Sequence, residues 1–87
     1  MNKTWSDEAW NEYVEWQTDD KKAVNKINEL LKDIDRSPFE GIGKPEPLKH
    51  ELTGFWSRHI TKEHRLVYKI KNDDSVYIAR CKYHYKK

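Results

Sequence analysis

The chain has 87 residues, 36% of them hydrophobic and 37% charged, and we predict one domain spanning residues 1–87 with a single small core. Aromatic residues make up 13% and supply enough bulk for that core, which argues against disorder. The sequence has no apolar run long enough to cross a membrane, no signal-peptide pattern and one cysteine, Cys81, which excludes an internal disulfide and a cysteine-based zinc site. We therefore expect a cytoplasmic protein that uses neither a metal nor another cofactor.

The net charge of +2 conceals an asymmetry between the two halves of the chain. Residues 1–43 hold 6 Lys and Arg against 10 Asp and Glu, a balance of −4. Residues 44–87 hold 11 against 5, a balance of +6. A basic half favours a polyanionic partner such as nucleic acid or an acidic protein segment. The alternative is that these charges only keep the surface solvated.

The first half predicts two helices joined by a short link. Ser6 is a suitable N-cap for a first helix, whose apolar side is expected at Ala9, Trp10, Tyr13, Val14 and Gln17, with Trp16 beside it. A second helix is expected to begin at Thr18 or Asp19, and its apolar positions are Ala23, Val24, Ile27, Leu30, Leu31 and Ile34. It ends at Ser37, because the residue before a proline resists the helical conformation. Trp5 is a candidate for a short N-terminal strand.

A loop rich in proline and glycine, residues 38–47, separates the two halves. Within it, Glu46 stands between Pro45 and Pro47, and the two prolines restrict its backbone. A semi-rigid carboxylate just before a basic stretch is a candidate functional group. The alternative is an ordinary exposed acid in a loop.

The second half predicts a three-stranded antiparallel meander, with strands at Phe55–Thr61, His64–Lys71 and Ser75–Tyr83. The fold class is therefore α+β, with a helical hairpin packed on one face of a small, mainly antiparallel sheet. Two-residue loops at Lys62-Glu63 and at Asp73-Asp74 would fix the register. They would turn the following residues toward the helices: Phe55, Ser57, His59, Leu66, Tyr68, Ile70, Tyr77, Ala79, Cys81 and Tyr83.

The same register predicts a basic face on the other side of the sheet. Six side chains are expected to gather there: Arg58, Arg65, Lys69, Arg80, Lys82 and His84. Arginine offers paired donors to phosphate, so such a face suits RNA. A solvated polar face without a ligand is the alternative.

Several segments resemble those of a known family. They are the run Phe39-Glu40-Gly41-Ile42-Gly43-Lys44-Pro45-Glu46-Pro47-Leu48-Lys49, the run Leu52-Thr53-Gly54-Phe55-Trp56-Ser57-Arg58-His59-Ile60, the segment Glu63-His64-Arg65-Leu66-Val67-Tyr68 and the ending Cys81-Lys82-Tyr83-His84-Tyr85. Together they resemble the YoeB (Txe) toxins of bacterial type II toxin–antitoxin systems, within the RelE/ParE superfamily. The resemblance implies a RelE-like fold and a ribosome-dependent mRNA endonuclease, or mRNA interferase, that cuts in the decoding site and is neutralised by a cognate antitoxin.

The resemblance also implies roles for single residues in a reaction that needs no metal. Glu46 corresponds to the general base that removes the proton of the ribose 2′-OH, and His84 to the general acid that protonates the leaving 5′-oxygen. Arg65 corresponds to the arginine that stabilises the charged transition state. Further RNA-binding positions are expected at Lys49, Arg58, Tyr85, Arg80 and Lys82.

The other histidines are expected to lie outside the catalytic set. His64 is expected to be a structural residue beside a turn, and His50 and His59 are expected at the surface or next to bound RNA. The expected partners are the ribosome with its mRNA and an antitoxin with a flexible acidic segment, and a homodimer is plausible by resemblance. The alternative function is a noncatalytic module that binds RNA, the ribosome or gyrase, because this superfamily also contains gyrase-directed toxins.

Overall fold

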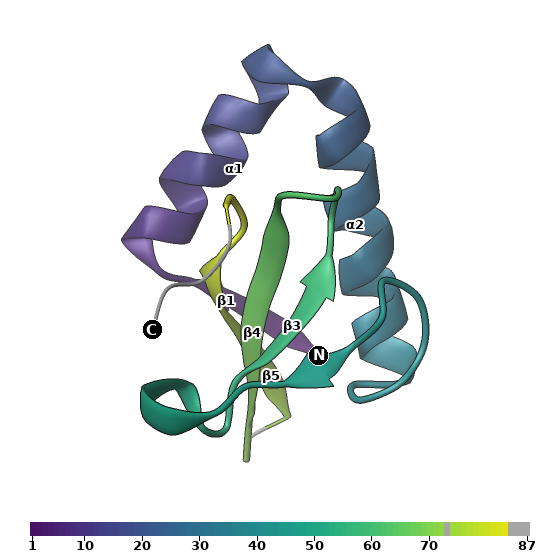
Figure 1. Cartoon of the computed structure of the whole chain (residues 1–87), viewed down its shortest axis with the longest axis vertical. Coiled ribbons are helices and arrows are strands. Elements are labelled where there is room, and N and C mark those ends of the chain that lie inside the picture. The colour runs from purple at the N-terminus through teal and green to yellow at the C-terminus, as the bar shows by residue number, and fades with distance from the viewer. Residues whose placement is uncertain (73, 84–87) are drawn as a thin grey trace.

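Two helices cover one face of a five-stranded sheet in the computed structural model, which describes residues 1–72 and 74–83 (Figure 1). The elements follow one another as β1 (Asn2–Trp5), α1 (Asp7–Asp19), α2 (Lys21–Arg36), β2 (Glu46–Pro47), the 3₁₀ turn η1 (His50–Leu52), β3 (Trp56–His59), β4 (Arg65–Lys71) and β5 (Ser75–Arg80). The strand order is β1-β5-β4-β3-β2, and only the β1–β5 pair is parallel. The predicted fold class is confirmed, and the strand suspected at Trp5 is β1.

Local capping explains where the helices begin and end. The Ser6 hydroxyl accepts a hydrogen bond from the Ala9 amide at 2.9 Å, which caps α1 as predicted. Asp20 ends α1 and starts α2, because its amide donates to the Trp16 carbonyl while its carboxylate accepts from the Lys22 amide at 3.0 Å. The second helix therefore begins later than Thr18 or Asp19. It ends at Ser37, as expected before a proline.

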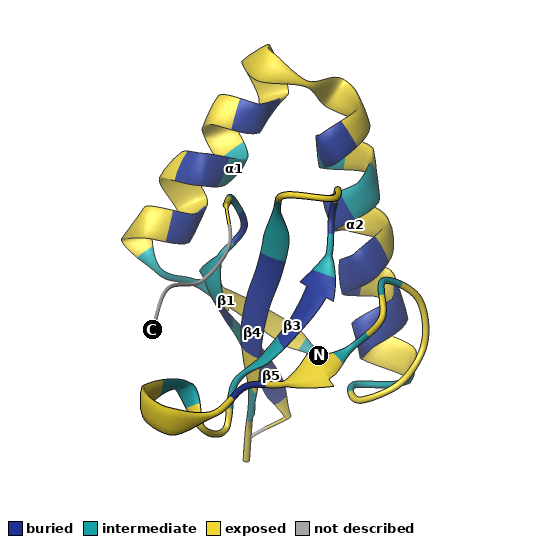
Figure 2. Ribbon diagram, in the orientation of Figure 1, coloured by how far each residue is buried: buried dark blue, intermediate teal, exposed yellow. Residues whose placement is uncertain are grey.

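The core lies between the helices and the sheet, and the buried bands of both helices face inward (Figure 2). The predicted apolar stripe of α2 is largely buried. The stripe predicted on α1 is partly wrong, because Trp10 and Val14 are exposed. Instead α1 buries Ala9, Glu12 and Trp16. No described helix is long and apolar enough to span a bilayer.

The first hairpin is shifted by one residue from the prediction. Arg58 pairs with Leu66 and Trp56 with Tyr68, whereas the two-residue loop would have paired Arg58 with Val67. A shift of one residue exchanges the two faces of a strand. Consequently Trp56, Arg58 and Ile60 turn toward the helices, while Phe55, Ser57 and His59 turn away.

The second hairpin is shifted in the same way, since Lys71 pairs with Ser75. Val76 and Ile78 therefore pack in the core, and Tyr77 lies on the other face. A bulge opposite Val67 and Tyr68 then changes the alternation, so Cys81 enters the core as predicted. Tyr83, which was expected in the core, is 58% exposed.

Candidate active site on the far face of the sheet

The sheet surface opposite the helices, here called the far face, brings Glu46 and Arg65 to the same side. Glu46 pairs with Ser57, and Ser57 pairs with Val67, so these three residues form one row across β2, β3 and β4. Arg65 lies two residues before Val67 on β4 and pairs with His59. From strand and residue spacing, the Cα atoms of Glu46 and Arg65 are roughly 12 Å apart. Two long side chains of opposite charge thus leave the same face at a distance that an RNA backbone can span.

Backbone pairing holds the segment that carries Glu46. The Gly43 carbonyl accepts from the His59 amide at 2.7 Å, and the Leu48 amide donates to the Phe55 carbonyl at 2.9 Å. Glu46 and Lys49 are exposed, and no ion pair between either side chain and another residue of the described ranges is found. A pocket of about 270 Å³ adjoins them, lined by Glu46, Pro47, Leu48, Lys49, His50, Glu51 and Leu52. The carboxylate is therefore placed by the backbone and is open to a ligand.

Arg65 is fixed along one edge only. Its Nη1 atom donates to the carbonyl oxygens of Thr61, Lys62 and His64 at 3.0–3.2 Å. These bonds tie the side chain to the β3–β4 turn. Toward the rest of the described chain, its Nη2 atom makes no hydrogen bond. This second edge of the guanidinium group can meet an anion.

The prediction that Arg58 lies on the RNA-binding face is wrong, because Arg58 is completely buried on the helix side. The corrected register turns it inward, where Nη1 meets the Asp33 carboxylate at 2.6 Å and Nε donates to the Tyr68 hydroxyl at 3.1 Å. The other hydrogen bonds reach the carbonyls of Ser37, at the end of α2, and of Glu40 and Ile42, in the proline-rich loop. Arg58 is therefore a structural residue that ties this loop to the sheet.

Asp33, the acidic partner, was missed at the sequence level. The only available signal is an acidic residue within the buried stripe of α2, next to Ile34. Hydrogen bonds from Arg36 and Arg58, and one from the Ile42 amide, lower the pKa of Asp33 from 3.8 to about 2. Gly41 belongs to the same arrangement, because a side chain at this position, where φ is +118°, would collide with the Asp33 carboxylate.

Arg80 and Lys82 also lie elsewhere than predicted, at and just after the end of β5, where their side chains meet α1. Arg80 Nη2 pairs with Glu12 at 2.6 Å, and this hydrogen-bonded contact raises the pKa of Arg80. Lys82 Nζ pairs with Glu15 at 2.8 Å and with Asp19 at 3.4 Å. These cations are neutralised by the first helix, so the open basic face expected from them does not form.

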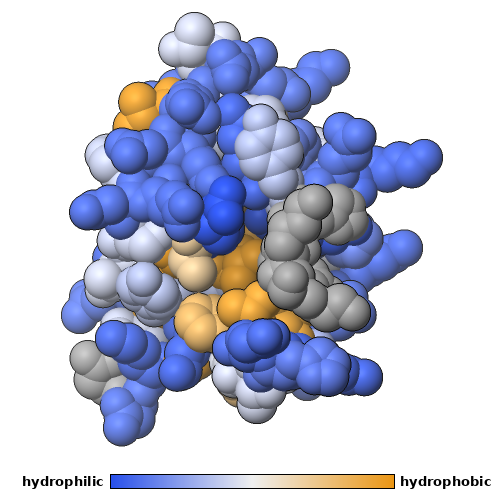
Figure 3. All heavy atoms as spheres, turned by 60° about the vertical axis from the view of Figure 1, so that its left-hand side comes forward, coloured by the Kyte–Doolittle hydropathy of each residue, from blue (hydrophilic) through white to orange (hydrophobic). Residues whose placement is uncertain are grey.

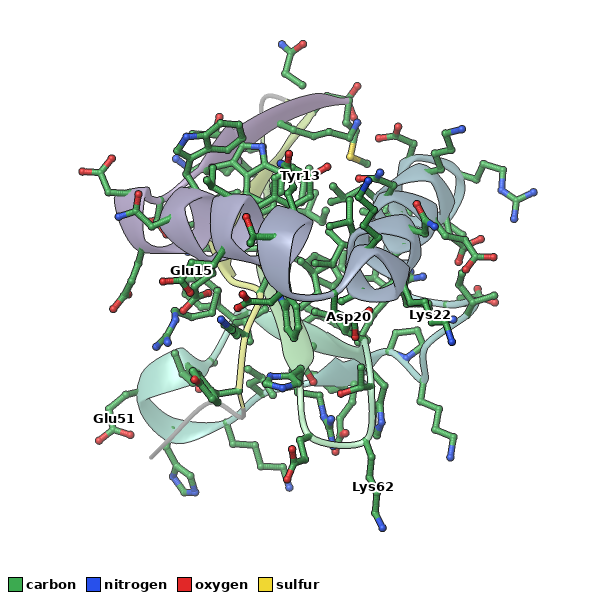
Figure 4. All side chains as sticks on the ribbon, turned by 90° about the horizontal axis from the view of Figure 1, so that it is seen from above. Tyr13, Glu15, Asp20, Lys22, Glu51 and Lys62 are labelled. Atoms are coloured by element: carbon green, nitrogen blue, oxygen red, sulfur yellow. The ribbon has the colours of Figure 1, made fainter. Side chains whose placement is uncertain are left out.

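The view in Figure 4, from above the helices, shows how the charged side chains are distributed. Tyr13, Glu15 and Lys22 belong to the helical layer, whereas Glu51 and Lys62 project on the opposite side. Two further lysines on the sheet stack over aromatic rings, Lys69 over Phe55 at 5.4 Å and Lys71 over Tyr77 at 5.5 Å. Of the six residues expected on the open face, the structure confirms this position for Arg65 and Lys69.

Tyr83, the last described residue, lies next to Arg65. The Arg65 amide donates to the Tyr83 carbonyl at 3.1 Å, and the Tyr83 amide donates to His64 Nδ1 at 2.6 Å. The predicted acid His84 and the predicted RNA-binding Tyr85 lie outside the described residues.

Seen from the side of α1, the surface is mostly hydrophilic with a small apolar patch at its centre (Figure 3).

Other reactive groups offer little chemistry. Burial raises the pKa of the Cys81 thiol to about 12, so this cysteine is a poor nucleophile. Across residues 1–72 and 74–83, no three His, Cys, Asp or Glu side chains are grouped to hold a metal ion.

Comparison with known proteins assigns the chain first to a class and then to a family. Its solved structural neighbours are toxins of the YoeB, ParE and RelE type, with the same helical layer and mainly antiparallel sheet. The model of the family described as "YoeB-like toxin of bacterial type II toxin-antitoxin system" matches residues 5–85. The chain belongs to this family.

Individual relatives are similar over nearly their whole length. The chain is 64% identical to toxin YoeB of Escherichia coli K12 over 85 residues, which cover 98% of this chain and 100% of the relative. It superposes on the YoeB dimer from Staphylococcus aureus with a TM-score of 0.91 at 57% identity, covering 98% of each chain. A heterotetrameric YoeB–YefM toxin–antitoxin complex from Staphylococcus aureus gives a TM-score of 0.90 at 56% identity, again covering 98% of each chain.

Proposed function

We propose that this protein is a ribosome-dependent mRNA endonuclease that cuts mRNA in the decoding site. The observation that carries the proposal is the common face of Glu46 and Arg65, in a chain of the YoeB-like family. The carboxylate and one edge of the guanidinium group are open to a ligand. A base and a cation that flank one phosphodiester are what RNA cleavage requires.

The reaction follows from the chemistry of RNA itself. Glu46 removes the proton of the 2′-OH, and the 2′-oxygen forms a bond to the adjacent phosphorus. The bond from phosphorus to the 5′-oxygen breaks, and an acid protonates that oxygen as it leaves. The products are a 2′,3′-cyclic phosphate and a 5′-hydroxyl group. Each proton transfer contributes about 10²- to 10⁴-fold to the rate.

Arg65 stabilises the negative charge that develops on the phosphate oxygens, and Lys49 adds positive charge beside Glu46. We assign the acid to His84 and an RNA-orienting role to Tyr85 from the family resemblance. The hydrogen bond from the Arg65 amide to the carbonyl of Tyr83, the residue before His84, supports this assignment. Arg58, Arg80 and Lys82 have no direct part in this proposal, because they are buried or paired with helix carboxylates.

The relatives suggest the partners. A Staphylococcus aureus relative forms a YoeB–YefM toxin–antitoxin complex, and another structure from that organism is a YoeB dimer. We propose that this chain binds a cognate antitoxin whose flexible acidic segment covers the far face, and that it forms a homodimer. An acidic segment complements Arg65, Lys49 and Lys69.

The proposal is tested by primer-extension mapping of a translated mRNA on purified ribosomes. Wild-type protein is compared with Glu46→Ala, with His84→Gln and with Lys32→Gln, an exposed position on α2, as a control on the opposite layer. We expect discrete cuts in the decoding codon that require ribosomes and fall at least about 100-fold in the first two variants. The control variant is expected to cut like the wild type.

A different result would select the alternative function. If the wild type binds ribosomes but leaves every message intact, the enzyme assignment is wrong and the chain is a noncatalytic binding module. If cutting persists in both Glu46→Ala and His84→Gln, the cleavage has a different acid–base mechanism.

A further inference from the structure

The last described residue, Tyr83, is held by two consecutive residues at the start of β4. Its amide donates to His64 Nδ1 at 2.6 Å, and its carbonyl accepts from the Arg65 amide at 3.1 Å. Tyr83 is 58% exposed, so apolar burial does not account for its position. The backbone of Tyr83 is thus fixed by hydrogen bonds.

The ring of His64 is itself held in place. It meets the buried Trp16 edge to face at a centroid distance of 4.8 Å, and it lies 5.2 Å from the ring of Tyr83. Trp16 Nε1 donates to the Cys81 carbonyl at 2.8 Å, which anchors the chain two residues before Tyr83. Lys82 Nζ lies 5.0 Å from the Trp16 ring and is paired with Glu15. Three successive residues are therefore fastened to α1 or to β4.

The hydrogen bond from the Tyr83 amide determines which nitrogen of the His64 ring carries the proton. Nδ1 can accept the Tyr83 amide proton only when it carries no proton of its own, so the ring is neutral with its proton on Nε2. No other acceptor for the Tyr83 amide occurs among the described residues. Loss of the His64 acceptor would leave this amide unpaired beside Arg65.

We propose that His64 is a positioning residue, whose Nδ1 atom fixes the backbone at Tyr83 so that the following residues start beside Arg65. This inference rests on the proposed function, because it supplies a reason for His84 to meet the phosphate that Arg65 stabilises. His64 itself does not touch the substrate. Arg65 also holds Tyr83, through its backbone amide. Unlike His64, Arg65 can in addition meet an anion, because its Nη2 atom makes no hydrogen bond to the described residues.

Two substitutions separate the hydrogen bond of His64 from its ring packing. His64→Asn keeps an acceptor, the amide Oδ1 atom, near the place of Nδ1 but removes the ring. His64→Phe keeps an aromatic ring against Trp16 and Tyr83 but has no acceptor. Both are measured by the rate of mRNA cleavage at saturating protein on ribosomes, by the half-saturating protein concentration and by the thermal midpoint of unfolding.

We expect His64→Phe to lower the saturating rate by about 100-fold, as misplacement of a reacting group does, with little change in half-saturating concentration. His64→Asn should recover most of that loss even if its thermal midpoint is lower. The reverse order, with His64→Phe active and His64→Asn inactive, would overturn the proposal and assign His64 to core packing. Equal activity of both variants would also overturn it.

A second measurement does not depend on catalysis. Amide hydrogen exchange of Tyr83, followed by NMR, should be slow in the wild type and in His64→Asn and fast in His64→Phe. If the wild type cuts no mRNA but this pattern holds, the proposed function fails and the positioning of Tyr83 by His64 stands. Fast exchange in the wild type would overturn the positioning whatever the activity.

Discussion

At the scale of single residues, Arg58 shows how much one side chain can organise. Its donors reach a carboxylate of α2, a hydroxyl of β4 and three backbone carbonyls, although the side chain has no exposed surface. A buried charge is tolerated only when it is paired and hydrogen-bonded. The same side chain would bind phosphate well if it were exposed, and the predicted register placed it on the exposed face.

The pKa of Asp33 predicts a pH dependence of stability. A carboxyl group whose pKa falls from 3.8 to about 2 on folding stabilises the folded state at all pH values above about 4. This contribution is lost as the pH falls from about 4 to 2. Asn at this position does not titrate, so the difference in unfolding free energy between wild type and Asp33→Asn should be constant from pH 7 to 5 and shrink below 4.

The measurement is urea unfolding followed by the fluorescence of the four tryptophans. Comparing the two proteins at each pH cancels other groups, including Asp35, whose pKa is lowered by Lys3. A difference that stays constant down to pH 2 would contradict the role given to the Asp33 carboxylate.

At the scale of elements, the sequence predicts which helices and strands form better than it predicts the register in which the strands pair. Ser6, Pro38 and the spacing of apolar residues in α2 predict the helix ends well. Both hairpins were predicted one residue out of register, because each turn is longer than the two residues expected. In the second turn, Asp74 adopts a positive φ of 64°. The bulge at Val67 and Tyr68 has no sequence signal, and it decides where Arg80 and Lys82 point.

The limits of the predicted strand pairing affected the candidate site in two ways. Arg58 was placed on the wrong face, whereas Glu46 could not be connected to Arg65 by pattern alone. The link is the pairing of β2 with β3, which depends on a two-residue strand too short to be recognised in a sequence. The relative position of Glu46 and Arg65 thus needed the structure, whereas residue type and family resemblance were enough to nominate both for the site.

The contacts of Arg58 predict how the proline-rich loop is held. In Arg58→Lys one ammonium group replaces a planar group that serves five acceptors, so loop carbonyls lose their donors. We expect the thermal midpoint to fall by more than about 10 °C and proteolysis between residues 37 and 44 to accelerate. Lys62→Arg, in the exposed β3–β4 turn, is the control and should change neither. Unchanged proteolysis in Arg58→Lys would show that the loop is held by other contacts.

At the scale of the whole molecule, the two layers carry opposite charge. The first 43 residues, with a balance of −4, supply β1, the helices and part of the loop, and the remaining residues, with +6, supply most of the sheet. Several charges cancel across the boundary, as in the pairs of Arg58 with Asp33 and of Lys82 with Glu15. Among the described residues, Arg65 and Lys69 lie on the far face and belong to no ion pair, and the exposed Lys49 follows β2.

This polarity predicts that binding to ribosomes depends on salt. Each cation that neutralises a phosphate adds about 0.7 to 1 to the slope of log affinity against log salt concentration. Lys49→Gln should lower the slope by about that amount, and the exposed helix control Lys32→Gln should leave it unchanged. Binding is measured by sedimentation with ribosomes at several salt concentrations. Equal slopes for wild type and Lys49→Gln would exclude a phosphate contact of Lys49.

The parallel pairing of β1 with β5 links the two ends of the chain. Asn2 lies beside Ser75 and Trp5 beside Ile78, so the first strand can take its place only after the last one exists. Contacts so distant in sequence form late, and domains fold as their segments become available. During synthesis, the sheet and its far face therefore stay incomplete until residues 75–80, which form β5, have emerged. Under the proposed function, a nascent chain that still lacks β5 cannot cut mRNA.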